Sequence, residues 1–99
     1  MIIYNVTTII EDGIHEEYVK YMKEVHMPEV MSTEKFTDCQ LLFLGEPITE
    51  GVTYCAQYMA KDAENLADYR MNFLPKLEQD LQQKFPNKLV SFASVLKKV

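Results

Sequence analysis

Two histidines are the side chains of this 99-residue chain with the clearest potential for chemistry. His26 lies two residues before Pro28 in the segment KEVHMPEVM, near the expected end of an amphipathic helix. An imidazole with its ordinary pKa of ~6.5 exchanges protons at neutral pH, which makes His26 a weak candidate for a general base. The alternative is that His26 contacts the last carbonyl groups of the helix, where a cation also suits the helix dipole. The spacing fixes no partner carboxylate, so both interpretations remain open.

Distance excludes a metal site built from both histidines. His15 lies on the same face of the expected helix, eleven residues before His26. At a rise of ~1.5 Å per residue, the two side chains are ~16 Å apart along the axis, too far to bind one ion. The chain also lacks the glycine-rich phosphate loops and the HEXXH and GXSXG motifs. We therefore expect neither a metal nor a cofactor.

Three tyrosines and a methionine extend the candidate site. Tyr4, Tyr54 and Tyr58 fall on predicted strands, where they can line a cavity and offer hydroxyl groups to a bound carbonyl or phenolate. Met22 is one of six methionines, which indicate an adaptable interior that can admit a ligand. The alternative for both residue types is ordinary core packing. The predicted ligand-binding residues are His26, Tyr4, Tyr54, Tyr58 and Met22.

Three further polar side chains fall among apolar neighbours. Asn5 and Gln57 are costly to bury unless they are hydrogen-bonded, so we expect them to meet across adjacent strands or across a dimer axis. Arg70 lies in the apolar stripe of a predicted helix, where it can bind a carboxylate ligand. Alternatively, Arg70 extends to solvent or pairs with Glu78 or Glu17.

The first third of the chain predicts a strand followed by a helix. Residues 2–10 are rich in β-branched side chains and end at the turn-forming residues 11–13. From Ile14 onward the apolar side chains recur at helical spacing. Because Pro28 lacks an N–H group, the main helix should stop or kink near His26, with a short turn after it.

The remainder of the chain predicts three more strands. Residues 36–45 and 52–60 are typical of strands and are joined by the loop 46–51, which contains Pro and Gly. These two segments should form a hairpin. Residues 89–96 form the last predicted strand.

A second helical region separates the hairpin from the last strand. Asp62 is a plausible N-cap, and the helical stripe that follows continues to Phe85. Pro75 lies inside this region and should kink or break it near residues 71–74.

The predicted order β-α-β-β-α-β is that of the ferredoxin-like α+β fold, a four-stranded antiparallel sheet with two helices on one face. We expect one domain over residues 1–99, with the first and third strands at the centre. The even-numbered strand residues are assigned to the helix side: Tyr4, Val6, Thr8, Leu42, Leu44, Val52, Tyr54, Ala56 and Tyr58. The odd-numbered residues, assigned to the other side, are Ile3, Asn5, Thr7, Ile9, Cys39, Leu41, Phe43, Thr53, Cys55, Gln57 and Met59.

That other side is substantially apolar, and two helices cannot cover both faces of the sheet. We expect a second copy of the chain to cover it, giving a homodimer closed into an α/β barrel. An interface of this kind buries ~1,600 Å² or more.

Composition restricts the remaining partners. Fifteen acidic and ten basic residues give a formal net charge of -5, which disfavours nucleic acid as a partner. No apolar run approaches the ~20 residues that cross a bilayer, and the opening residues lack the basic region of a signal peptide. We therefore expect a cytoplasmic protein, no membrane partner, and reduced Cys39 and Cys55.

The opening MIIYNVT, the helix-end segment HMPEVM, the strand GVTYCAQY and the order of elements resemble an uncharacterised family of small stand-alone proteins, a domain of unknown function. That family is similar to the dimeric α/β-barrel superfamily, which contains cofactor-free monooxygenases, isomerases and stress-responsive proteins. The resemblance covers residues 1 to about 96. It implies a pocket between helices and sheet, bordered by an H-x-P element that matches residues 26–28. Oxygenases of this fold often use a Trp, which this chain lacks.

Three functions remain consistent with the sequence. The first is a homodimer that binds a small apolar or aromatic molecule, or supports another protein, without catalysis. The second is a cofactor-independent monooxygenase or isomerase, in which His26 or a tyrosine hydroxyl moves a proton in a dry pocket. The third is a purely structural self-associating domain. A cavity of ~300 Å³ or more beside His26 favours the first two, and a solid core there favours the third.

Overall fold

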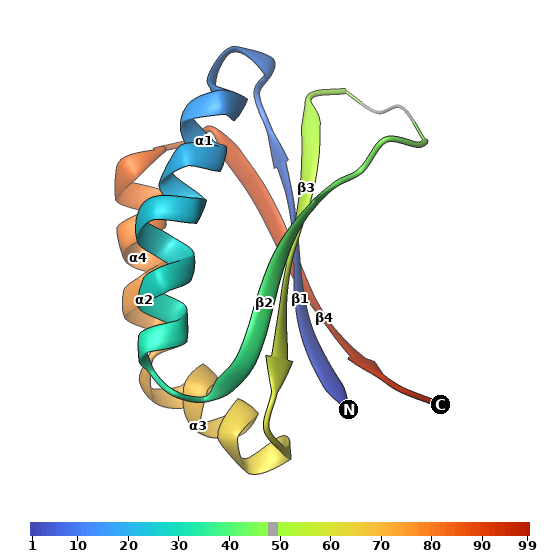
Figure 1. The fold of residues 1–99 in the computed structure, drawn as a ribbon. Helices are drawn as coiled ribbons and strands as arrows, with labels where there is room; N and C mark the ends of the chain where they lie inside the picture. The colour runs from blue at the N-terminus through green and yellow to red at the C-terminus, as the bar shows by residue number, and fades with distance from the viewer. Residues whose placement is uncertain (48–49) are drawn as a thin grey trace.

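The computed structural model describes residues 1–47 and 50–99, and within them the chain forms one sheet packed against a layer of helices (Figure 1). Part of the predicted hairpin loop, Ile48 and Thr49, lies outside the described residues. The strands are β1 (Ile2–Ile10), β2 (Phe36–Phe43), β3 (Val52–Ala60) and β4 (Leu89–Lys97). The helical elements are η1 (Asp12–Ile14), α1 (His15–Tyr21), η2 (Met22–His26), α2 (Met27–Ser32), α3 (Ala63–Asn72) and α4 (Leu74–Lys84).

The sheet has the predicted ferredoxin-like topology. Its strand order is β2-β3-β1-β4, every neighbouring pair is antiparallel, and β1 and β3 are central. All the helices lie on one side of the sheet, which leaves the other side open (Figure 1). Across the two central strands Tyr4 is opposite Tyr58, and Asn5 is opposite Gln57. The order of elements, the central strands and the hairpin of β2 with β3 are therefore confirmed.

The first helical region does not stop at His26, contrary to one of the two predicted outcomes. It continues through α2 to Ser32, and the expected disturbance takes the form of a π-helical segment, η2, directly before α2. Pro28 occupies the first turn of α2, where its missing N–H group is tolerated. The wider π turn preceding it avoids the clash that the proline ring would cause in a regular α-helix. His26 therefore lies inside a helical run and does not cap a helix end.

The second helical region breaks where Pro75 predicted. α3 ends at Asn72, α4 begins at Leu74, and Phe73 between them has a φ of -119°. The Asp62 side chain accepts a hydrogen bond of 2.7 Å from the Asn65 backbone N–H group, which confirms it as the N-cap of α3.

The predicted faces are right for β1 and β3 and wrong for β2. An irregularity in the pairing between Phe36 and Asp38 shifts the register, so that Cys39 lies opposite Tyr58 and Leu41 opposite Ala56. Directly paired residues share a face, so an extra residue in one strand moves all later side chains to the other side. As a result Cys39, Leu41 and Phe43 lie on the helix side, whereas Leu42 and Leu44 lie on the open side.

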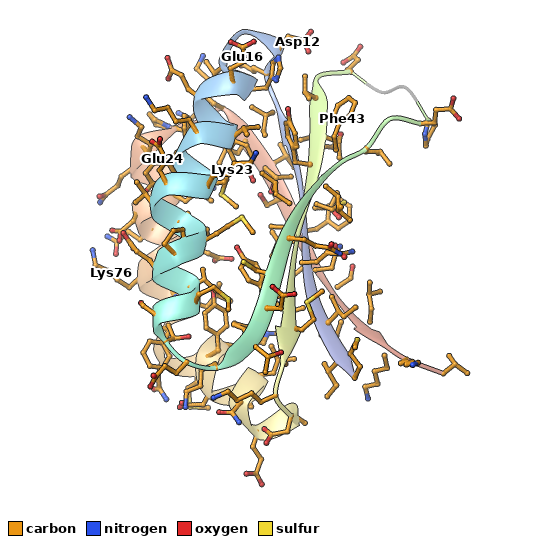
Figure 2. The ribbon with its side chains drawn as sticks, in the orientation of Figure 1. Asp12, Glu16, Lys23, Glu24, Phe43 and Lys76 are labelled. Atoms are coloured by element: carbon orange, nitrogen blue, oxygen red, sulfur yellow. The ribbon has the colours of Figure 1, made fainter. Side chains whose placement is uncertain are left out.

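Aromatic side chains dominate the core between sheet and helices. The buried rings of Tyr4 and Tyr69 meet edge to face at 6.0 Å, and Phe36 lies 4.8 Å from Tyr69 and 5.3 Å from Tyr58. By contrast, Glu24 and Lys76 point away from the sheet on the outer side of the helix layer (Figure 2). The helices thus have one apolar and one solvated side, as an element that covers a sheet requires.

Candidate functional site

A cavity of about 190 Å³ lies between the helices and the sheet, and of the H-x-P element at residues 26–28 only His26 lines it. The buried and half-buried residues around it are Tyr4, Val6, Thr8, Tyr18, Met22, His26, Ala56, Tyr58, Tyr69, Leu74 and Leu81. The exposed residues around it are Glu78 and Gln82 from α4 and Ser91 from β4, which mark its mouth. The volume is below the ~300 Å³ expected of a binding or catalytic pocket, although the space is not a solid core either. It is comparable to the ~150 Å³ apolar cavity that holds a benzene molecule in another protein.

His26 reaches this cavity from the π-helical segment. Its side chain is only 8% exposed. Burial lowers the pKa of His26 to about 4, and the opposing effect of the Asp80 carboxylate is smaller. At neutral pH the imidazole is therefore uncharged. A group with so low a pKa is a weak base at pH 7, although its neutral ring can exchange hydrogen bonds with a ligand.

Tyrosine hydroxyl groups supply most of the interior polarity. Burial raises the pKa of Tyr58 and of Tyr69 well above the ordinary range, and it also raises the pKa of Tyr18. All three are therefore protonated near neutral pH. The Tyr58 hydroxyl is buried without a hydrogen-bond partner among the described residues. A buried polar atom left in this state costs about 1–3 kcal/mol, so Tyr58 has an unused donor and acceptor beside the cavity.

Four of the five predicted ligand-binding residues line this one cavity. Tyr4, Tyr58, Met22 and His26 are brought together, two from the central strands and two from one helical run. Tyr54 is not among the lining residues. It lies near the start of β3, where its hydroxyl group is 3.1 Å from Nδ1 of His15.

Several residues that line the cavity are not among the predicted site residues. Tyr18 precedes Met22 and His26 at intervals of four residues, which places all three on one helix face, and this spacing could have identified it. Glu78 and Gln82 also follow each other at an interval of four on α4. Ser91 gives no such local signal, because it joins the site through a hydrogen bond of 2.8 Å between its Oγ and Thr8 Oγ1 on β1.

Arg70 lies over the Tyr4 ring, with its guanidinium carbon 5.4 Å from the ring centroid. Arg70 forms no ion pair with Glu78 or Glu17 in the described part of the chain. It does not line the cavity. The interaction observed for Arg70 is therefore a cation–π contact with Tyr4.

The open face of the sheet carries a row of hydrogen-bonded amides. Gln40 Nε2 donates to Gln57 Oε1 at 2.8 Å, and Gln57 Nε2 donates to Asn5 Oδ1 at 3.2 Å. Asn5 Nδ2 in turn donates to Thr7 Oγ1 at 3.1 Å. The predicted meeting of Asn5 and Gln57 across adjacent strands is confirmed.

Apolar side chains surround this polar row on the same face. Phe92 and Val90 of β4 are 55% and 66% exposed, and they pair with Thr7 and Ile9 of β1. Leu96 and, on the opposite edge strand, Leu42 are also exposed on this face. Large apolar side chains gathered on an uncovered sheet face are typical of an interaction surface.

Other kinds of site find no support in the described residues. They contain no group of three or more His, Cys, Asp or Glu side chains placed to hold a metal ion. Cys39 and Cys55 are both free thiols, and they lie on opposite faces of the sheet. No helix in residues 1–47 and 50–99 is long and apolar enough to cross a membrane.

Solved structures with the same fold place the chain in a class. An ethyl tert-butyl ether d (EthD) family protein from Bacillus halodurans matches with a TM-score of 0.69 and 14% identity, covering 100% of both chains. SnoaB, a cofactor-independent oxygenase from Streptomyces nogalater, matches with a TM-score of 0.66 and 15% identity over 98% of this chain and 92% of its own. A dimeric ferredoxin-like protein from an uncultured marine organism has a TM-score of 0.61 and 15% identity over 99% and 96% of the two chains. The chain is thus an α+β protein of the ferredoxin-like fold.

The family follows from the sequence match. Residues 1–99 match the domain of unknown function DUF4286, so the chain belongs to that family. No curated protein matches the chain in sequence.

Proposed function

We propose that the chain binds a small apolar or aromatic molecule in the cavity beside His26, and that it does so as a homodimer formed through the open face of the sheet. The observation that carries the binding function is the cavity itself, with its tyrosine-rich lining and its neutral buried imidazole. Ligand sites are typically concave, mostly apolar and supplied with a few fixed polar groups, and this cavity has each of these properties.

Binding is better supported than catalysis. SnoaB, which shares the fold, is described as an oxygenase that needs no cofactor. Proton abstraction at neutral pH favours a base with a pKa near 7, whereas burial lowers the pKa of His26 to about 4. The tyrosine hydroxyl groups are protonated and are also poor bases. His26 and the tyrosines are therefore better suited to hold a molecule than to deprotonate it.

The area of the open face is near the lower limit for a specific interface. Strands of eight or nine residues extend ~30 Å, and four strands at a spacing of ~4.8 Å span ~19 Å. The face therefore measures ~570 Å², and two copies together bury ~1,100 Å², which exceeds the ~1,000 Å² minimum for a specific interface but is less than the ~1,600 Å² expected from the sequence. The marine protein with the same fold is described as dimeric, which is consistent with this assembly.

Native mass spectrometry of protein purified from its own host tests both parts of the proposal. The expected result is a mass of two subunits with a retained small molecule. The binding part is then tested with toluene by saturation-transfer NMR on the parent protein and on two matched variants. Val6→Ile adds a methyl group inside the cavity and should weaken the signal, whereas Val19→Ile adds the same group away from it. A parent protein that retains nothing and gives no transfer would contradict the binding function.

Two single substitutions, each adding one negative charge to a different surface, test the dimer. Phe92→Asp places a carboxylate on the open face, and Met71→Asp places one on α3, at a position 77% exposed and distant from that face. Sedimentation velocity should show the Met71 variant as a dimer and the Phe92 variant shifted toward monomer. A monomeric parent protein, or two variants that associate equally well, would rule out the open face as the interface.

A further inference from the structure

The mouth of the cavity carries one carboxylate and no cation. Glu78, Gln82 and Ser91 are the exposed lining residues, and the described lining residues include no Lys or Arg. Arg70 is not among the lining residues, but it lies over the ring of Tyr4, and its charge lowers the pKa of Tyr4 by more than Glu78 raises it, while burial has the largest effect and raises that pKa. A ligand that enters here passes a negative charge, which attracts hydrogen-bond donors and repels carboxylates.

The buried lining residues carry no charge of their own that could pair with a charged ligand. His26 is neutral at pH 7 because burial lowers its pKa to about 4, and the surrounding tyrosines are protonated. A charged group taken from water into such an interior loses its hydration without gaining a counter-ion. Uncharged ligands avoid this cost.

Two observations favour one aromatic ring as the buried part of the ligand. The cavity volume of about 190 Å³ suits a single ring, since ~150 Å³ is enough for benzene. The Tyr58 hydroxyl, which lacks a partner among the described residues, can direct its hydrogen toward the negative face of such a ring. The rings of Tyr4 and Tyr69 are available for edge contacts with the same ligand.

We infer that the cavity selects an uncharged, single-ring aromatic molecule that carries a hydroxyl group, with its ring among the tyrosines and its hydroxyl donating to Glu78 at the mouth. This inference rests on the proposed binding function and adds the chemical class of the ligand. Phenols and aryl alcohols belong to this class, whereas aryl carboxylates do not.

The test compares p-cresol with 4-methylbenzoate, which have the same ring and methyl group and differ in charge. Dissociation constants are measured at pH 7 by titration in ¹H-¹⁵N NMR. The parent protein should bind p-cresol at least about tenfold more tightly, equivalent to about 1.4 kcal/mol. Glu78→Lys should reverse that order, because it exchanges the anion at the mouth for a cation. Gln79→Lys, one residue further along α4 and outside the cavity lining, should leave the order unchanged.

The outcomes separate this inference from the binding function on which it rests. If p-cresol and 4-methylbenzoate bind equally, or if Glu78→Lys keeps the parent's preference, the ligand class is wrong while the cavity remains a binding site. Binding that is insensitive to Val6→Ile would place the ligand outside the cavity and would overturn the inference as well. Failure of toluene and both probes to bind would overturn the binding function itself.

Discussion

The buried imidazole of His26 should make the stability of this protein depend on pH in a range where carboxylates are still ionised. The side chain is 8% exposed, and burial lowers its pKa to about 4, with a smaller opposing effect from Asp80. In the unfolded chain the pKa returns to ~6.5. Between these two values the unfolded state binds one more proton than the folded state, so acid favours unfolding.

The size of the effect follows from the two pKa values. As the pH falls from 6.5 to 4, the free energy of unfolding decreases by ~1.4 kcal/mol per pH unit. Above pH 6.5, the neutral His26 no longer lowers the stability. The parent protein should therefore lose about 2 kcal/mol of its free energy of unfolding between pH 7 and pH 5, and about 3 kcal/mol by pH 4. The interval from pH 7 to 5 is the better one for the measurement, because few carboxyl groups titrate there.

Urea denaturation at pH 7, 6 and 5 measures this loss. His26→Leu keeps an apolar side chain of similar size in the core and removes the titrating group, so its free energy of unfolding should vary about 2 kcal/mol less over that range. His15→Leu, which keeps His26, is the matched control and should retain the loss that His26 causes. Parallel curves for the parent and the His26 variant would refute the conclusion that the folded protein holds this imidazole in its neutral form.

Two further substitutions test the structure of the sheet. Gln57→Leu removes the central amide of the row on the open face and leaves Gln40 and Asn5 without their shared partner. The free energy of unfolding, measured by urea denaturation, should fall by about 1–2 kcal/mol. An unchanged midpoint would mean that water replaces both hydrogen bonds. Gly51→Ala should cost about 1–3 kcal/mol, because Gly51 has a φ of +76° and an added Cβ would lie 2.7 Å from the Ile10 carbonyl oxygen. A thermal unfolding midpoint equal to that of the parent would contradict this close approach.

Local signals in the sequence were sufficient for the order and most boundaries of the elements. The β-branched run of residues 2–10 predicted β1 because alternating, branched side chains suit an extended backbone. Asp62 and Pro75 predicted the start and the interruption of the second helical region through hydrogen bonds made or lost within one turn. The contact between Asn5 and Gln57 in the polar row could also be predicted, because buried amides need hydrogen-bond partners and the two residues lie on neighbouring strands.

Part of the candidate site could be predicted for the same reason. Tyr4, Tyr58, Met22 and His26 follow the periods of a strand and a helix, so their common side could be predicted from spacing. The mouth could not, because Glu78, Gln82 and Ser91 meet there only after α4 packs beside β4. The sequence also could not show whether His26 caps a helix or lies buried, because this depends on the π-helical segment η2, which lets the helical run continue through Pro28.

By itself, then, the sequence determined the succession of strands and helices, because each element depends on neighbours within a few residues. That succession, with right-handed crossovers, was enough to predict the topology. Tertiary structure decided which face β2 presents, since an irregularity of one residue between Phe36 and Asp38 reverses every side chain after it. It also decided that a cavity of about 190 Å³ remains between the layers, because a void is a property of how distant side chains fill a shared space.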